Sequence, residues 1–223
     1  MLVKLSHNLS ERTPFYDGLP GPEIEQLYDL RKGDTCNSFF FRTSNHAGTH
    51  VDAPLHFDPD GRSIVDYDLS ELVFTRPAVM DVPLGECELI EPRHLQASAA
   101  VRPDCDILLL RSGFACRRAS DAVTYVARGP GFSRTAAEYL LRRLPELRAV
   151  AVDFISIASM AHMEEGCDAH RVFLGCPGYG ERPILLVEDA WLPESLPLPR
   201  KVFVIPLFFE GLDSAPCTMF AEV

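Results

Sequence analysis

The sequence predicts a single α/β domain, in which helices pack on a sheet of short, mostly buried strands. Its 223 residues are enough for one domain with a full hydrophobic core and do not require a second. Hydrophobic residues make up 47% of the chain, as in globular proteins. Strand-like and helix-like runs mix without a low-complexity linker or an internal repeat, so we expect residues 1–223 to form one domain.

Six short runs rich in Val, Ile, Leu or Phe predict strands, and each is bounded by polar residues or by Pro and Gly. Several carry apolar residues at consecutive positions, which is typical of strands that are buried on both faces. The predicted strands are residues 38–42, 78–82, 107–111, 149–152, 184–187 and 202–206.

The clearest predicted helix covers residues 134–144. Ser133 can cap its amino terminus, apolar residues repeat at helical spacing, and Arg142 and Arg143 lie near its end. It leads directly into the strand predicted at 149–152, as a helix that packs across a sheet does. Weaker helical patterns occur at 23–30 and 92–98.

Charge and composition narrow the possible partners. Asp and Glu number 32 against 21 Lys and Arg, and the net charge of -11 repels phosphate backbones and anionic lipids. The longest apolar runs fall far short of the roughly 20 residues that cross a bilayer, and the amino-terminal segment lacks the apolar stretch that a signal peptide needs.

The cysteines give no sign of a disulfide framework or a structural zinc knuckle, because the seven are scattered and none forms a CxxC pair. We expect a cytoplasmic protein that acts on a small molecule, without nucleic-acid or membrane partners.

Residues 46–56, HAGTHVDAPLH, concentrate three of the seven histidines and one aspartate in one short segment. A fully extended chain would separate His46 from His50 by about 13 Å, too far for two nitrogens that each lie about 2 Å from one ion. The chain must therefore bend between them, and Gly48 can supply the bend. We expect a turn at 47–49, a short strand that begins at His50, and a break at Pro54.

The residue types in this segment predict a divalent-metal site. His46, His50 and Asp52 would hold Zn²⁺ or Mn²⁺, and two imidazoles with one carboxylate leave positions open for water and substrate, as in catalytic sites. Such an ion activates water and polarises a carbonyl group. His56 lies four residues beyond Asp52, which suits an acid/base group better than a further ligand.

Read as HxGTHxDxPxH, residues 46–56 resemble the signature of the cyclase family of metal-dependent hydrolases, which includes bacterial kynurenine formamidase and isatin hydrolase. The resemblance implies a domain with a central barrel-like mixed β-sheet flanked by helices, and it implies a homodimer or homotetramer. It extends along the chain through the blocks DILLLRSGF at 106–114, PGFSRTAAEYLL at 130–141, AVAVDFISIAS at 149–159, DAHRVFLG at 168–175, LLVEDAWL at 185–192 and IPLFFEGLDSAP at 205–216.

The resemblance also implies a set of site residues for one or two ions. These are His46, His50 and Asp52 as ligands of the first ion, His56 as the catalytic residue, and His170 and Glu188 as ligands of a second ion to which Asp52 bridges. The sequence CPGYGERP lengthens the stretch between His170 and Glu188, so Glu181 or Glu165 could take the place of Glu188 as the carboxylate ligand.

These residues predict hydrolysis of a carbon–nitrogen bond in a small amide or lactam, with His56 relaying a proton. Phe15-Tyr16-Asp17-Gly18 stand where the formamidases of the family carry a tryptophan, so the substrate stays open. A non-hydrolytic cyclase or dehydratase of the same family is the alternative, because the same ion-polarised carbonyl serves both reactions. The gain or loss of one water in the product would distinguish them.

Two further classes are less favoured. His50-Val51-Asp52 is also the HxD of an iron oxygenase with His162 or His170 as third ligand, but such enzymes usually need a strand-dominated jelly roll. A metal-storage or structural protein would fill every ligand position with protein groups, whereas the predicted site leaves positions open.

Single residues outside the cluster have weaker claims to a role. Neither Ser112 nor Ser156 lies in a GxSxG elbow, so we do not expect a serine nucleophile. Asp153 could orient a ligand or a loop.

Overall fold

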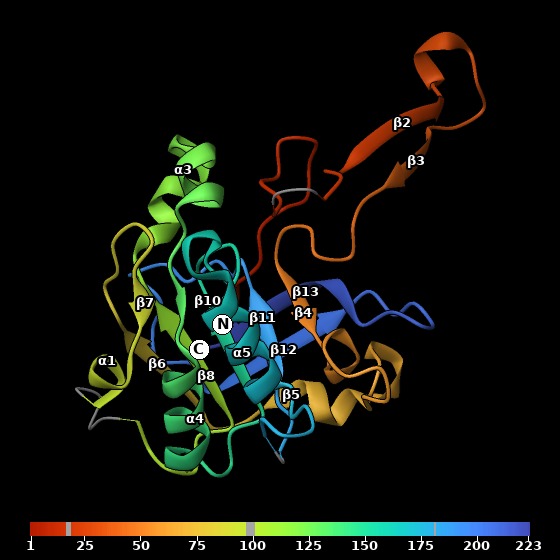
Figure 1. The fold of residues 1–223 in the computed structure, drawn as a ribbon. Helices are drawn as coiled ribbons and strands as arrows, with labels where there is room; N and C mark the ends of the chain where they lie inside the picture. The colour runs from red at the N-terminus through yellow and green to blue at the C-terminus, as the bar shows by residue number, and fades with distance from the viewer. Residues whose placement is uncertain (17–18, 97–100, 181) are drawn as a thin grey trace.

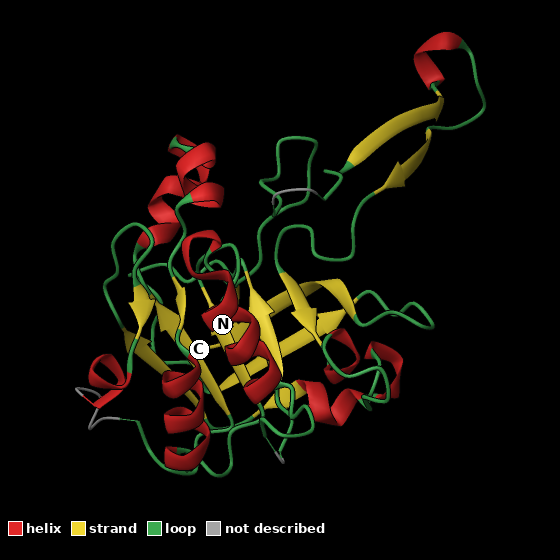
Figure 2. Ribbon diagram, viewed as in Figure 1, coloured by secondary structure: helices red, strands yellow, loops and turns green. Residues whose placement is uncertain are grey.

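A mixed sheet of nine strands forms the centre of the molecule and nearly closes into a barrel (Figures 1 and 2). The computed structural model describes residues 1–16, 19–96, 101–180 and 182–223. The strands of this sheet are β1 (Leu2–Lys4), β4 (His50–Asp52), β5 (Val73–Phe74), β6 (Pro77–Asp81), β8 (Ile107–Arg111), β10 (Ala149–Val152), β11 (Leu185–Glu188), β12 (Lys201–Pro206) and β13 (Ser214–Glu222). The expected barrel-like mixed sheet flanked by helices is confirmed.

The sheet has a parallel half and an antiparallel half. Its order is β5-β12-β13-β4-β11-β10-β8-β6, with β1 on β13. Strands β6, β8, β10 and β11 run parallel, and β4 joins them to the antiparallel strands β13, β12 and β5. The five strands predicted at 78–82, 107–111, 149–152, 184–187 and 202–206 all belong to this sheet, and each end lies within one residue of its prediction.

Alternate residues of the central strands enter two separate cores, which is why these strands read as continuous apolar runs. In β8, Ile107 and Leu109 face the interior of the curled sheet, where they pack with Val51 of β4. Leu108 and Leu110 point to the opposite face and pack in the core that the helices cover. The site residues described below lie on this helix-covered face.

Helices α4 (Arg134–Arg143) and α5 (Met163–Phe173) pack side by side on that face. Ser133 caps α4 as predicted, because its hydroxyl oxygen accepts a hydrogen bond from the backbone N–H of Ala136 at 3.1 Å. The weaker prediction at 92–98 is confirmed as α1 (Pro92–Gln96), and its last residues lie outside the described part of the chain. Shorter elements complete the fold: β7 (Leu89–Ile90), β9 (Gly131–Phe132), α2 (Arg117–Ser120) and α3 (Ala122–Ala127).

The helix predicted at 23–30 is wrong. Residues Glu23–Tyr28 form strand β2, which pairs antiparallel with β3 (Ser38–Arg42), and a short 3-10 helix over Leu30–Lys32 follows β2. Strand β3 confirms the prediction at 38–42, although its side chains are mostly exposed. The two strands form a hairpin that projects from the body of the molecule (Figure 1). We call residues 23–42 the arm.

Among the described residues, none of the helices has the length and apolar content that a bilayer crossing requires. All seven cysteines are unpaired.

Candidate metal centre

The turn before β4 brings its histidines into position. Gly48 has a φ of 64°, which glycine adopts without strain, and the chain bends there before β4 begins at His50. A 3-10 helix over Pro54–His56 follows the strand. The predicted turn, strand start and break at Pro54 are therefore confirmed. Val51 faces the barrel interior, so His50 and Asp52 point to the helix-covered face.

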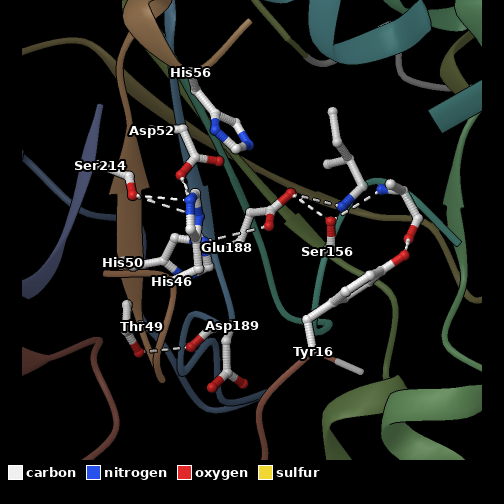
Figure 3. A network of polar contacts seen from close by, with 12 residues as sticks. Tyr16, His46, Thr49, His50, Asp52, His56, Ser156, Glu188, Asp189 and Ser214 are labelled. Atoms are coloured by element: carbon white, nitrogen blue, oxygen red, sulfur yellow. Dashed lines mark hydrogen bonds and ion pairs between the residues drawn. The ribbon is translucent and has the colours of Figure 1, made fainter. Parts of the chain in front are cut away.

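Neighbouring strands and a helix add further polar groups to this face. In the register of β4 with β11, Glu188 lies opposite His50, and in the register of β4 with β13, Ser214 lies opposite Asp52. Directly opposed residues of paired strands point to the same side of a sheet, so these side chains converge (Figure 3). From α5, His170 reaches Glu188. The structure thus brings all six predicted site residues together.

The distances define two adjoining groups that share Asp52. His46 Nδ1 and His50 Nε2 lie 3.2 Å and 3.5 Å from Asp52 Oδ1. Glu188 Oε2 lies 3.4 Å from His50 Nε2, and Glu188 Oε1 lies 3.4 Å from His170 Nε2. The ligand atoms of His46, Asp52 and His56 all lie within 4.8 Å of one another, and so do those of His50, Asp52 and Glu188.

Two of the imidazoles are fixed from behind by backbone carbonyls. Nδ1 of His50 lies 2.9 Å from the carbonyl oxygen of Gly48, and Nδ1 of His170 lies 2.8 Å from that of Gly166. Because a carbonyl oxygen only accepts, each Nδ1 carries the proton and Nε2 is left for the site. A histidine that ligates a metal is usually held in this way.

The buried donors fit a divalent cation. Asp52 is fully buried, and within the described part of the chain neither of its carboxylate oxygens has a hydrogen-bond partner; the same holds for Nε2 of His50. Unpartnered buried polar atoms destabilise a fold, and a buried carboxylate needs compensating positive charge. Imidazole nitrogens with carboxylate oxygens are the ligand set of Zn²⁺ and also suit Mn²⁺.

The pKa values of these groups reflect the several carboxylates that lie close together in the site. Burial lowers the pKa of His46, but the nearby carboxylates of Asp213 and Asp52 outweigh burial and raise the pKa to about 10. Burial raises the pKa of Glu188, but its contacts with His170 and His50 outweigh burial and bring it well below the usual range. The carboxylates are therefore ionised at neutral pH and attract positive charge.

Asp213 is a site residue that sequence reasoning did not assign. It lies 2.7 Å from Nδ1 of His56 and 3.4 Å from Nε2 of His46. Pairing of β13 with β4 places it there, because its carbonyl oxygen accepts a hydrogen bond from the backbone N–H of Ala53 at 2.9 Å. The sequence feature that could have identified Asp213 is its place in the block IPLFFEGLDSAP, which is one of those that carry the family resemblance.

Glu188 is held by the loop that follows β10. Its Oε1 accepts hydrogen bonds from the backbone N–H of Ile157 at 2.7 Å and from the hydroxyl of Ser156 at 3.0 Å (Figure 3). Glu165, the alternative carboxylate, is exposed and instead accepts a hydrogen bond from the backbone N–H of Arg134. Glu181 lies outside the described residues. Glu188 is thus the carboxylate that the described part of the chain brings to His50 and His170.

The residue after Glu188 belongs to a second buried network that sequence reasoning also missed. Asp189 is fully buried, and its carboxylate accepts two hydrogen bonds from Arg118, both at 2.7 Å, and one from the hydroxyl of Tyr125 at 2.6 Å. Its carbonyl oxygen accepts a hydrogen bond from the hydroxyl of Thr49 at 2.6 Å (Figure 3). This network ties the end of β11 to the residue before His50.

Two other residues that the sequence analysis named, Asp153 and Tyr16, are hydrogen-bonded to loops. Asp153 accepts hydrogen bonds from the backbone N–H and hydroxyl of Ser112 and from the backbone N–H of Gly113, so it orients the loop after β8. The hydroxyl of Tyr16 donates to the carbonyl oxygen of Ala158 at 2.9 Å, two residues beyond Ser156 (Figure 3). His162 is exposed, and the mixed sheet with its parallel half and packed helices differs from the jelly roll of an iron oxygenase.

Known proteins resemble this chain over nearly its whole length and not only at the site residues. Cyclase-like protein 2 of Oryza sativa subsp. japonica is 27% identical over 228 residues, which cover 96% of this chain and 76% of that protein. Isatin hydrolase A from Labrenzia aggregata has the same fold, with a TM-score of 0.82 at 20% identity over 99% of this chain and 93% of that one. A structure titled as a potential metal-dependent hydrolase with cyclase activity gives 0.72 at 18% identity, over 99% and 96% of the two chains. Residues 3–159 match the family described as "Putative cyclase", and since this match covers most of the chain, the protein belongs to the cyclase family.

Proposed function

We propose that the protein is a metal-dependent hydrolase that cleaves a carbon–nitrogen bond in a small amide or lactam. The observation that carries the proposal is the fully buried Asp52, whose two unpartnered oxygens lie among imidazole nitrogens. Isatin hydrolases with the same fold support a hydrolytic reaction. A structure titled as a potential metal-dependent hydrolase with cyclase activity, which has the same fold, supports a metal-dependent reaction.

The proposed ligands form two sets that both include Asp52, and these sets are not identical with the two groups that the distances define. His46, His50 and Asp52 would hold a first Zn²⁺ or Mn²⁺ ion, and Asp52 would bridge to a second ion held by His170 and Glu188. When bound, a divalent ion in this donor set activates water and polarises the substrate carbonyl. Fixed Nδ1 positions of His50 and His170 keep their Nε2 atoms aimed at the ion sites.

His56 is the proposed acid/base group. Its Nδ1 lies 2.7 Å from Asp213, which holds the ring in one orientation and leaves Nε2 to exchange a proton with the substrate. Its side chain is 26% exposed, whereas that of His50 is 3% exposed, so His56 lies on the accessible side of the site. The attacking water would give a proton to His56 Nε2, and the leaving nitrogen would take that proton from His56 as the carbon–nitrogen bond breaks.

The first experiment is elemental analysis of purified protein, followed by assays with formylkynurenine and isatin. Asp52→Ala should abolish metal binding and activity together, because the residue belongs to both ion sites. Asp58→Ala is the matched control, since Asp58 lies on the same segment and its carboxylate accepts a hydrogen bond from the backbone N–H of Asp60. Full activity of Asp52→Ala would exclude the assignment.

A second candidate reaction is cyclisation or dehydration without net hydrolysis. The neighbour titled as a hydrolase with cyclase activity favours keeping it, because one ligand set serves both reactions. The mass of the product relative to the substrate decides between them: hydrolysis adds one water, dehydration removes one, and cyclisation by isomerisation leaves the mass unchanged.

A further inference from the structure

Asp189 has an uncommon backbone conformation directly after the proposed ligand Glu188. Its φ is 51°, and among the non-glycine residues that the structure describes only Cys87 also has a positive φ. Such a conformation persists only where the surroundings hold it, although Asp and Asn adopt it more readily than most residues. The backbone N–H of Asp189 donates to the carbonyl oxygen of Phe154 at 2.9 Å. The chain therefore turns out of β11 at a residue that needs support.

Two side chains from α2 and α3 provide that support. Arg118 and Tyr125 donate the three hydrogen bonds that the carboxylate of Asp189 accepts. The side chain of Arg118 is only 13% exposed. Burial lowers the pKa of Arg118, but its hydrogen bonds and charge attraction with Asp189 outweigh burial and raise it. A guanidinium that donates two charge-assisted hydrogen bonds fixes both the position and the plane of a carboxylate.

The backbone of Asp189 transmits this order to the strand that carries the histidines. Its carbonyl oxygen accepts a hydrogen bond from the hydroxyl of Thr49 at 2.6 Å (Figure 3). The same hydroxyl oxygen accepts a hydrogen bond from the backbone N–H of His7 at 2.9 Å. Thr49 is buried, and because its hydroxyl both donates and accepts, it has one preferred orientation. Asp189 thereby holds Thr49 in place.

The contact between Asp189 and Thr49 lies beyond the last pair of the β4–β11 ladder. That ladder pairs Leu186 with Asp52 and ends where Glu188 lies opposite His50. The left-handed turn at Asp189 interrupts the ladder, and the hydroxyl of Thr49 supplies the next contact between the two segments. Oε2 of Glu188 lies 3.4 Å from Nε2 of His50. Both proposed ligands are therefore covalently bonded to a residue of this contact.

We propose that Asp189 is a positioning residue for the metal centre, because it sets the spacing of His50 and Glu188. Arg118 and Tyr125 act through it, so α2 and α3 influence the centre although their side chains bind to Asp189 and not to an ion. The inference rests on the proposed ligand set. Removal of a group that orients metal ligands typically lowers metal affinity by about 10- to 100-fold.

Titration of metal-free protein with Co²⁺ tests the inference, because the visible absorption of this ion depends on the geometry of its ligands. Thr49→Val and Tyr125→Phe each remove one hydroxyl, and we expect each to lower Co²⁺ affinity by about 10-fold and to change the absorption spectrum. Asp189→Asn keeps a side chain that tolerates a positive φ but removes the charge, so its loss should be about 10- to 100-fold. Thr49→Ser keeps the hydroxyl and should restore native affinity and the native spectrum.

Asp106→Asn is the matched control. Asp106 is also a buried aspartate that accepts backbone hydrogen bonds, from Thr75 at 2.8 Å and Arg76 at 2.9 Å, and that lies 3.4 Å from an arginine, Arg148. It precedes β8, whereas Asp189 follows the parallel strand β11, so the two aspartates lie at opposite ends of the sheet. Asp106→Asn should lower the melting temperature of the metal-free protein but leave Co²⁺ affinity and spectrum unchanged.

The outcomes separate this inference from the ligand assignment. Native Co²⁺ affinity with an unchanged spectrum in Thr49→Val and Asp189→Asn would overturn the positioning role and leave the ligand set intact. An equal loss of affinity in Asp106→Asn would overturn it as well, because general destabilisation would then explain the effect. A native chain that binds no Co²⁺ would overturn the ligand set and this inference together. Circular dichroism shows which variants are folded, and if Asp189→Asn is not, the comparison of Thr49→Val with Thr49→Ser decides.

Discussion

His56 and Asp213 carry the proposed proton transfer, and their contact gives a prediction at the scale of single residues. Asp213→Asn keeps the shape of the side chain but removes the charge that holds His56 Nδ1 at 2.7 Å. We expect turnover to fall by about 10- to 100-fold while metal content stays near native. His56→Ala should lower turnover further, by about 10² to 10⁴, also with the metal retained.

Steady-state kinetics with elemental analysis of the same samples checks this pair of variants. Asp60→Asn, at an exposed position on the segment after His56, serves as the control. Loss of metal from His56→Ala in proportion to its loss of activity would make His56 a ligand, which its place within 4.8 Å of His46 and Asp52 permits geometrically.

Glu188 gives a second prediction, which decides among the carboxylates that the sequence left open. Glu188→Gln keeps an oxygen for the N–H of Ile157 and the hydroxyl of Ser156 but removes the negative charge beside His50 and His170. We expect affinity for a second ion to fall by about 10- to 100-fold in calorimetric titration, with the first ion affected less. Glu165→Gln should leave both affinities unchanged, and the reverse result would move the ligand role to Glu165.

The sequence could predict the residues of the site that lie close together in the chain. His46, His50 and Asp52 share one short segment, and their spacing alone requires the bend that Gly48 makes. Asp213 lies more than 150 residues away from His56 in the chain and arrives through the pairing of β13 with β4. Spacing within a segment carries no information about such pairing, so only the fold reveals it.

At the scale of elements, β2 shows how a local pattern can mislead. Apolar residues at 24, 27 and 28 repeat as on one face of a helix. The structure has a β-bulge between Gln26 and Tyr28, which adds a residue and shifts the two-residue alternation of the strand. Pairing with Phe39–Phe41 then decides the conformation, since β-structure depends on neighbours that are distant in sequence. Strands β8 and β10, buried on both faces, leave no such ambiguity.

Close packing of α5 against the loop after β10 gives a prediction for a whole element. A Cβ atom at Gly166 would lie 2.3 Å from Cα of Ala158, so Gly166→Ala must move α5 away from that loop. The helix carries His170 and the loop holds Glu188, so their contact should lengthen. We expect a loss of about 1–3 kcal/mol in stability and weaker binding of a second ion.

Thermal unfolding and calorimetric titration of Gly166→Ala measure these two effects. Gly85→Ala is the matched control, because the nearest atom to its added Cβ is a flexible Glu88 oxygen at 3.5 Å. Native stability and native ion binding in Gly166→Ala would show that α5 can shift without disturbing the site.

At the scale of the whole molecule, the sequence indicated the class of fold but not the order in which the strands pair. Runs such as 107–111 and 149–152 predict buried strands, but their order in the sheet depends on pairings that no single run encodes. The antiparallel strands β4 and β13 are the clearest example, since neither was expected to lie at the junction of the two halves. That junction is where His50, Asp52 and Glu188 meet, so the topology builds the site.

Because several distant segments meet there, removal of metal should affect the stability of the whole domain. An ion that binds only the folded chain raises the free energy of unfolding by about 4 kcal/mol when its free concentration is 1,000 times the dissociation constant. For a domain of this size, 1 kcal/mol shifts the melting temperature by about 2–4 °C, so chelation should lower it by roughly 10 °C. Readdition of Zn²⁺ or Mn²⁺ should restore it. Asp52→Ala should melt at the same temperature with and without chelator, and an equal metal-dependent shift in that variant would place the stabilising ion elsewhere in the molecule.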